Sequence, residues 1–191
     1  KNIPPRQQIR SALAPYLDII IFVVTLLVAN YFWKFTVYGD EGDTLVTWFG
    51  LNITAPFDFL ARHITREVYW LIGLFRDTCT LASPTSYYFD SGVGTNIVWS
   101  CTPLKQSFIW LCLLLTTRGG WKHKIWYIPL GWVCIYIFNL LRIFAISLLT
   151  EFHPEWFELL HTYIFKWLFY GMMFLLWLLF TDKVRYIGKA K

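Results

Sequence analysis

The chain has 191 residues, of which 57% are apolar and 20% aromatic, and its formal net charge is +5. An apolar fraction this large exceeds that of soluble globular proteins and indicates a polytopic membrane protein. Most of the basic residues fall in the two terminal tails and in the short turn at 117–124, so the positive charge predicts membrane topology, and no nucleic acid is expected as a partner.

Four apolar runs are long enough to span a bilayer, at roughly 17–35, 97–116, 125–149 and 160–181. A helix needs about 20 mostly apolar residues to cross the hydrocarbon core. The region 42–76 is amphipathic and interrupted by glycine and proline, which favours one or two surface or re-entrant helices. The sequence therefore predicts an all-α polytopic integral membrane protein in which residues 1–191 form a single membrane-embedded domain.

Charge alternates between the segments that join these runs. The tail before residue 17, the turn at 117–124 and the tail after residue 181 each sum to +3. The loops at 36–96 and 150–159 sum to −4 and −3. Cytoplasmic segments carry the excess of Lys and Arg, so we expect both termini in the cytoplasm and both acidic loops outside.

Arg142 is the only charged residue in the apolar run Ile125–Leu149. A guanidinium at the centre of a span costs about 2.5–3.5 kcal/mol on insertion scales, so an intramembrane Arg marks a candidate functional site. At 1.5 Å per residue, Arg142 is expected ~10 Å from the outer end of its span. Cys101 lies near the outer end of the second span and His161 at the outer end of the fourth. Three reactive groups are thus expected at one depth.

A thiol, an imidazole and a guanidinium together predict nucleophilic catalysis. Cys101 would attack as a thiolate, His161 would act as general base and acid, and Arg142 would stabilise an oxyanion or hold a carboxylate. Thr102-Pro103 resembles a helix N-cap followed by a first-turn proline, which would place Cys101 against a helix N-terminus. In a continuous helix, Lys105 would instead lie one turn below Cys101. Either arrangement favours the thiolate.

Structural interpretations remain open for the same residues. Cys101 could be a packing residue, or it could form a disulfide with Cys79. Arg142 could form an ion pair with an outer-loop acid such as Asp90 or Glu158. The sequence has no CxxC, HExxH, GxSxG or Walker A motif, and no metal or other cofactor is expected.

The order of the candidate residues resembles the exosortase/archaeosortase family. The matching pieces are SCTPLKQS around Cys101, NLLRI with Asn139 and Arg142, and His161 before a long apolar run. They cover about residues 95–181. A histidine in the third position is similar to the bacterial exosortase pattern, and four spans would make this chain a compact member.

The resemblance implies a cysteine transpeptidase or protease at the outer face of the bacterial cytoplasmic (inner) membrane. Its partners would be exported proteins that end in a short motif, a hydrophobic span and a basic tail, together with membrane lipid and an acceptor that the sequence does not identify. By position, the catalytic residues would be Cys101, Arg142 and His161, and Asn139 and Lys105 would act at the substrate. A non-catalytic subunit that binds a partner span and a thiol-dependent membrane acyltransferase remain alternatives.

Overall fold

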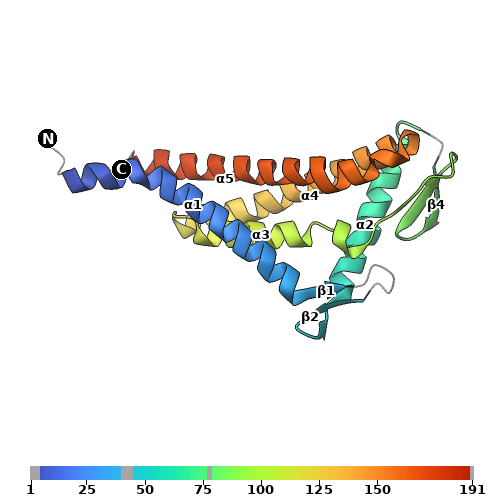
Figure 1. The fold of residues 1–191 in the computed structure, drawn as a ribbon, viewed down its shortest axis with the longest axis horizontal. Helices are drawn as coiled ribbons and strands as arrows, with labels where there is room; N and C mark the ends of the chain where they lie inside the picture. Colours follow the sequence, from blue (N-terminus) through green and yellow to red (C-terminus); the bar gives the residue numbers. More distant parts are fainter. Residues whose placement is uncertain (1–4, 40–44, 77–78, 190–191) are drawn as a thin grey trace.

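The computed structural model describes residues 5–39, 45–76 and 79–189. Its helices are α1 (Pro5–Thr36), α2 (Thr54–Gly73), α3 (Leu104–Thr116), α4 (Trp121–Phe152) and α5 (Phe165–Lys189). In Figure 1, α1, α3, α4 and α5 run along the molecule, and both ends of the described chain lie at the same end as the α3–α4 turn. The other end carries α2 and two small sheets. The chain therefore passes along the bundle four times.

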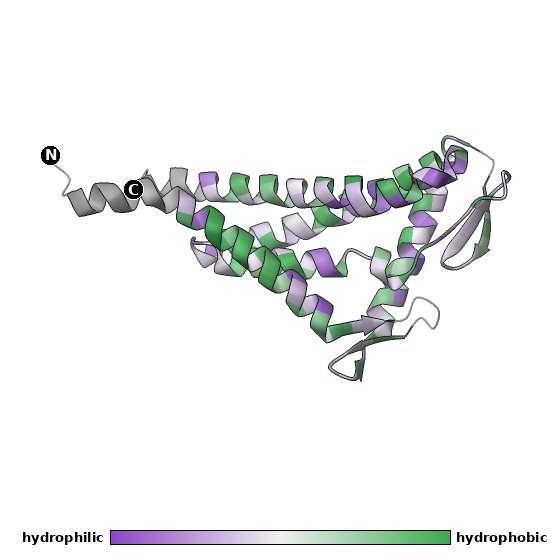
Figure 2. Ribbon diagram, in the orientation of Figure 1, coloured by the Kyte–Doolittle hydropathy of each residue, from purple (hydrophilic) through white to green (hydrophobic). Residues whose placement is uncertain are grey.

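Three of the four predicted spans coincide with helices that are long and apolar enough to cross a membrane, namely Tyr16–Thr36, Trp121–Phe152 and Pro154–Asp182. Figure 2 shows a strongly apolar stretch along the middle of α1, whereas polar residues are mixed along α2. The protein is therefore mostly helical, and its apolar helices are compatible with a membrane-embedded protein. The topology prediction also used charged residues that lie outside the described residues, within 1–4, 40–44, 77–78 and 190–191.

The predicted span at 97–116 is shorter than expected. Its helix, α3, has 13 residues and begins at Leu104, which gives a length of ~20 Å against the ~30 Å hydrocarbon core. The preceding residues form a 3₁₀ turn, η1 (Trp99–Cys101), and an extended Thr102 with φ −76° and ψ 151°. A residue before proline is disfavoured in the α region, so Pro103 ends the possibility of a continuous helix. By length, α3 falls short of the three helices that are long enough to cross a membrane.

The predicted outer loop at 36–96 contains two three-stranded antiparallel sheets, which the all-α prediction did not include. The strands are β1 (Val37–Gly39), β2 (Val46–Trp48), β3 (Leu51–Asn52), β4 (Cys79–Ser83), β5 (Ser86–Phe89) and β6 (Gly94–Asn96). Phe49 and Gly50 turn the chain between β2 and β3 with φ of 47° and 82°. Strands of two to five residues are too short for the alternation of polar and apolar residues that predicts a strand.

The amphipathic helix predicted within 42–76 is confirmed as α2. Pro56 does not break it, because Pro56 lies in the first turn, where its missing N–H would have no intrahelical partner. The Oδ1 atom of Asn52 accepts a hydrogen bond from the Thr54 N–H over 2.9 Å and so substitutes for a cap at this end.

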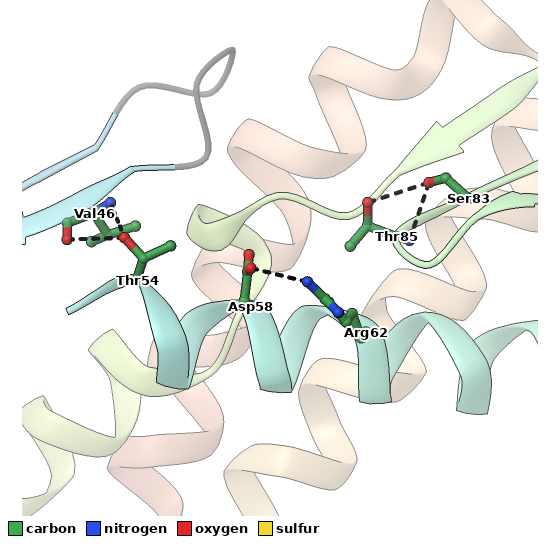
Figure 3. A network of polar contacts seen from close by, with 6 residues as sticks. All are labelled: Val46, Thr54, Asp58, Arg62, Ser83 and Thr85. Atoms are coloured by element: carbon green, nitrogen blue, oxygen red, sulfur yellow. Dashed lines mark hydrogen bonds and ion pairs between the residues drawn. The ribbon is translucent and has the colours of Figure 1, made fainter. Parts of the chain in front are cut away.

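A threonine fixes the start of α2 to the first sheet. Figure 3 shows the Thr54 hydroxyl beside the backbone of Val46, whose N–H donates to Thr54 Oγ1 over 2.9 Å. Val46 is fully buried and packs with Val37 and Phe57 in one cluster. The first turn of α2 therefore has a fixed position beside the end of α1, where the cavity described below is found.

Helix α3 packs closely against α4 at Gly131. Trp110 of α3 is fully buried among apolar residues that include Phe22, Ile135 and Trp177. A Cβ atom on Gly131 of α4 would collide with the Trp110 indole ring. The glycine therefore allows the two helices to approach, as small residues do between membrane helices.

Gly131→Ala is expected to lower the free energy of unfolding by about 1–3 kcal/mol, because the buried indole must shift to admit the methyl group. The matched control is Gly171→Ala in α5, where an added Cβ meets no atom within 4 Å. The control should unfold at the same or a higher temperature than the wild type, since alanine is the better helix former. Thermal unfolding in detergent measures both, and equal midpoints for the two variants would contradict the packing.

A tyrosine joins the second sheet to α4. Tyr87 of β5 is fully buried, and its Oη lies 2.6 Å from Ser147 Oγ. Burial raises the pKa of the Tyr87 phenol to about 12 from its ordinary value of 10.0. The phenol is therefore neutral in the folded protein at all physiological pH values.

Because the folded pKa of Tyr87 lies above its unfolded value, the neutral phenol stabilises the fold below about pH 10, and this contribution is lost as the pH rises from about 10 to about 12. Tyr87→Phe should therefore reduce the fall in unfolding temperature across that pH window. The control is Tyr88→Phe, which changes the exposed neighbour. If both variants lose stability with pH as steeply as the wild type, Tyr87 does not titrate as its burial requires.

Candidate functional site

A cavity of about 400 Å³ lies where the end of α1, the first turn of α2, the segment before α3 and the start of α5 come together. Arg142 and His161 both line this cavity, and so does Lys105. The structure thus brings three of the five candidate site residues to one space. The segments that line it, β1 among them, lie toward the sheet-bearing end of the bundle, away from the chain ends (Figure 1).

Arg142 is largely buried and has no acidic partner among the described residues. Its Nε atom is buried without a hydrogen-bond partner in this part of the chain. None of the ion pairs formed by described residues includes Arg142, so it pairs with neither Asp90 nor Glu158. Cys101 is close enough to act electrostatically on the guanidinium. A cation in this state can stabilise negative charge that develops nearby.

His161 lies in a π-helical segment, η3 (Leu159–Ile164), which directly precedes α5. Its imidazole stacks on the Phe157 ring at 5.3 Å between centroids, with 10° between the planes. A π-helical turn widens the helix locally and is frequent at functional sites. The sequence placed His161 at the start of a regular span, so this change of helix type was not predicted.

Cys101 lies beside the cavity, and its own side chain is not part of the lining. The neighbours Ser100 and Thr102 do line it. The half-buried Cys101 packs instead against the apolar cluster that includes Tyr87 and Ile143. All four cysteines are thiols, so the alternative Cys79–Cys101 disulfide is not formed. Burial raises the pKa of Cys79, and the nearby carboxylates Glu151 and Asp90 add to the shift.

A helix does begin shortly after Cys101, as one of the two alternatives predicted, but one residue later than expected, and the alternative of a continuous helix is wrong. The helix begins at Leu104, and its N-cap is Pro103, which makes no side-chain capping bond. The Thr102 hydroxyl donates to the Trp99 carbonyl over 2.7 Å instead of capping α3. Lys105 lies in the first turn of α3, so it reaches the cavity from a separate element and not from one turn below Cys101.

Asn139 holds the backbone of Cys101. Its side chain is 1% exposed, and Nδ2 donates to the Cys101 carbonyl over 2.9 Å. Asn139 does not line the cavity, whereas Arg142, one turn later on α4, does. Asn139 therefore links the backbone of the candidate nucleophile to α4, the helix that carries Arg142. Polar side chains commonly form such hydrogen bonds between neighbouring segments of membrane proteins.

Sequence analysis missed two further cations of the cavity. Lys34 at the end of α1 and Lys166 at the start of α5 line it together with Lys105 and Arg142. In the sequence, each lysine stands near the outer end of an apolar run. A lysine in that position is expected to extend its ammonium group to the membrane–water interface. Only the spatial arrangement of the helices shows that these charges face one space.

Asn139→Leu is expected to expose Cys101, because it leaves the Cys101 carbonyl without its bond, at a cost of about 1–3 kcal/mol. The rate at which maleimide modifies Cys101, measured in a background with the other three cysteines changed to Ser, should rise on the order of tenfold. Asn96→Leu is the control, since Asn96 is exposed in β6. An unchanged rate in Asn139→Leu would show that this bond does not hold the segment.

The chain stands apart in comparisons with known proteins. No protein-family model, no curated protein and no solved structure matches it. The function of the chain is therefore inferred from the geometry of the cavity and from the order of Cys101, Arg142 and His161 along the sequence.

Proposed function

We propose that the chain is a membrane cysteine transpeptidase or protease of the exosortase type, which cleaves C-terminal sorting tails of exported proteins. The observation that carries the proposal is the shared cavity: Arg142 and His161 line it, and the residues on either side of Cys101 do as well. These groups come from three separate elements, α4, η3 and the segment before α3. Packing alone gives no reason for them to meet.

The reaction would proceed through an acyl-enzyme. His161 would take the proton of the Cys101 thiol, and the thiolate would add to the scissile carbonyl carbon. Arg142 would stabilise the oxyanion of the tetrahedral intermediate. Collapse would break the C–N bond, His161 would return the proton to the leaving amine, and an acceptor nucleophile or water would then release the thioester. The Cys101 side chain must turn toward the cavity for this step, while Asn139 holds its backbone.

The position of the cavity suits a substrate that is itself anchored in the membrane. Phe22 of α1 contacts Trp177 of α5 with 4.8 Å between ring centroids. From that contact the two helices diverge toward the sheet-bearing end (Figure 1), and both contribute side chains to the cavity. A sorting tail with its own span would approach laterally between them. In the proposed orientation both termini are cytoplasmic and the cavity faces the outer surface.

Cys101→Ser should reduce turnover by more than about 10³-fold, because a hydroxyl cannot replace the thiolate at neutral pH. Mass spectrometry of protein C-termini, from cells that carry wild type or variant, measures this directly. Membrane proteins that keep a hydrophobic and basic tail only in the variant would be the substrates. Cys112→Ser is the matched control, since Cys112 is half-buried in α3 and does not line the cavity.

Unchanged C-termini, with Cys101→Ser present at normal abundance, would contradict the proposal. That result would favour a non-catalytic subunit that binds a partner span. A fatty acyl group recovered on Cys101 as a thioester would instead favour a membrane acyltransferase, because both reactions use the same activated thiol.

A further inference from the structure

The cavity concentrates positive charge. Its lining contains four basic side chains from four separate helices: Lys34, Lys105, Arg142 and Lys166. No Asp or Glu among the described residues lines it, and none of the four cations belongs to an ion pair formed within this part of the chain. Four like charges around about 400 Å³ repel one another unless an anion lies among them.

Lys166 and Lys34 both lie near enough to Lys105 for their charges to act on it. These three residues stand at the end of α1, the first turn of α3 and the first turn of α5. Cations on three elements that converge on one space are a recognition geometry for an anion, whereas cations that extend separately into solvent are not.

Three buried polar atoms of the lining also lack partners among the described residues. They are the Trp99 Nε1 donor, the Arg142 Nε donor and the Gln106 Oε1 acceptor. Buried polar groups are normally hydrogen-bonded, so three unpartnered atoms on residues of one lining single this place out. Arg142, one of the four cations, supplies one of the two unpartnered donors.

Much of the rest of the lining is apolar. Trp33, Phe57, Phe165 and Phe169 contribute aromatic rings, and Val37 and Ile109 add aliphatic surface. A small hydrated anion would gain nothing from these walls. A ligand that carries both an anionic head and a hydrocarbon body would satisfy the cations and the apolar surface together.

We propose that this cavity binds the phosphate headgroup of an anionic membrane lipid. A phosphate presents several oxygens to cations on different helices, whereas the single carboxylate of a peptide side chain leaves most of them without a partner. Lysines near the ends of apolar helices lie at the depth of lipid phosphates, which are abundant there. The inference shares the cavity with the proposed function, but it rests on the lysines and not on the thiol.

The test is lipid retention measured by native mass spectrometry on the purified protein, with phosphatidylglycerol and phosphatidylcholine as probes. The wild type should retain phosphatidylglycerol in preference to phosphatidylcholine. Each lysine near a lipid phosphate contributes about a fivefold effect, so Lys105→Gln/Lys166→Gln should weaken the retention of phosphatidylglycerol about 25-fold. Lys34→Gln/Lys166→Gln should weaken the retention of phosphatidylglycerol by a similar factor. The side chains of Lys34 and Lys166 are both exposed, so this double substitution leaves the core intact.

Two control variants distinguish lipid binding in the cavity from non-specific binding to surface lysines and from catalysis. Lys122→Gln removes an exposed lysine from the first turn of α4, at the opposite end of the bundle, and should retain the lipid as the wild type does. Cys101→Ser should also retain it, whether or not the variant is catalytically inactive. Loss of turnover and loss of lipid are therefore scored independently.

Three results would overturn the inference. The first is equal retention of the two lipids by the wild type. The second is full displacement of the lipid by millimolar inorganic phosphate, which would show a site for the free anion. The third is unchanged lipid retention in both lysine variants, and loss of tail cleavage in the same variants would then assign the cations to an acidic peptide substrate.

Discussion

A guanidinium held inside an apolar helix, with no carboxylate against it among the described residues, is the constraint from which the rest of the site follows. Placing Arg142 in a span costs about 2.5–3.5 kcal/mol on insertion scales, and packing apolar side chains around it would add to that cost. The bundle instead leaves a cavity at this point and lines it with polar groups such as Thr102, Gln106 and His161. A hollow in this part of the bundle is the consequence of the charge.

Two irregular segments make room for that hollow. Before α3, the 3₁₀ turn and Pro103 stop the helix from continuing to the level of Cys101. Before α5, the π-helical turn η3 carries His161 away from regular helical spacing. Neither segment would keep its position alone, because short irregular backbone needs outside hydrogen bonds. Asn139 supplies one from α4 to the Cys101 carbonyl, so the helix that bears the buried cation also positions the thiol.

The sequence predicted those features that depend on residues close together in the chain, and it did not predict features that depend on contacts between distant segments. Hydropathy over 20 residues identified α1, α4 and α5, and the amphipathic pattern identified α2, because helical periodicity is local. The small sheets were missed, since pairing between short strands such as β4 and β5 depends on tertiary contacts. The shared depth of Arg142 and His161 could be inferred from topology. The side-by-side arrangement of Lys34, Lys105 and Lys166 could not, because it depends on which helices are neighbours.

The cations also connect stability with occupancy. An empty cavity leaves four like charges facing one another across a partly apolar space, so every anion that enters lowers the energy of the folded state and leaves the unfolded chain unaffected. Because the charges stand on α1, α3, α4 and α5, such a ligand would join all four helices at the end where α1 and α5 diverge (Figure 1). At the other end, Phe22 and Trp177 already hold α1 to α5. Apolar packing would thus hold the helices together at one end of the bundle, and electrostatic attraction to a bound anion would hold them together at the other.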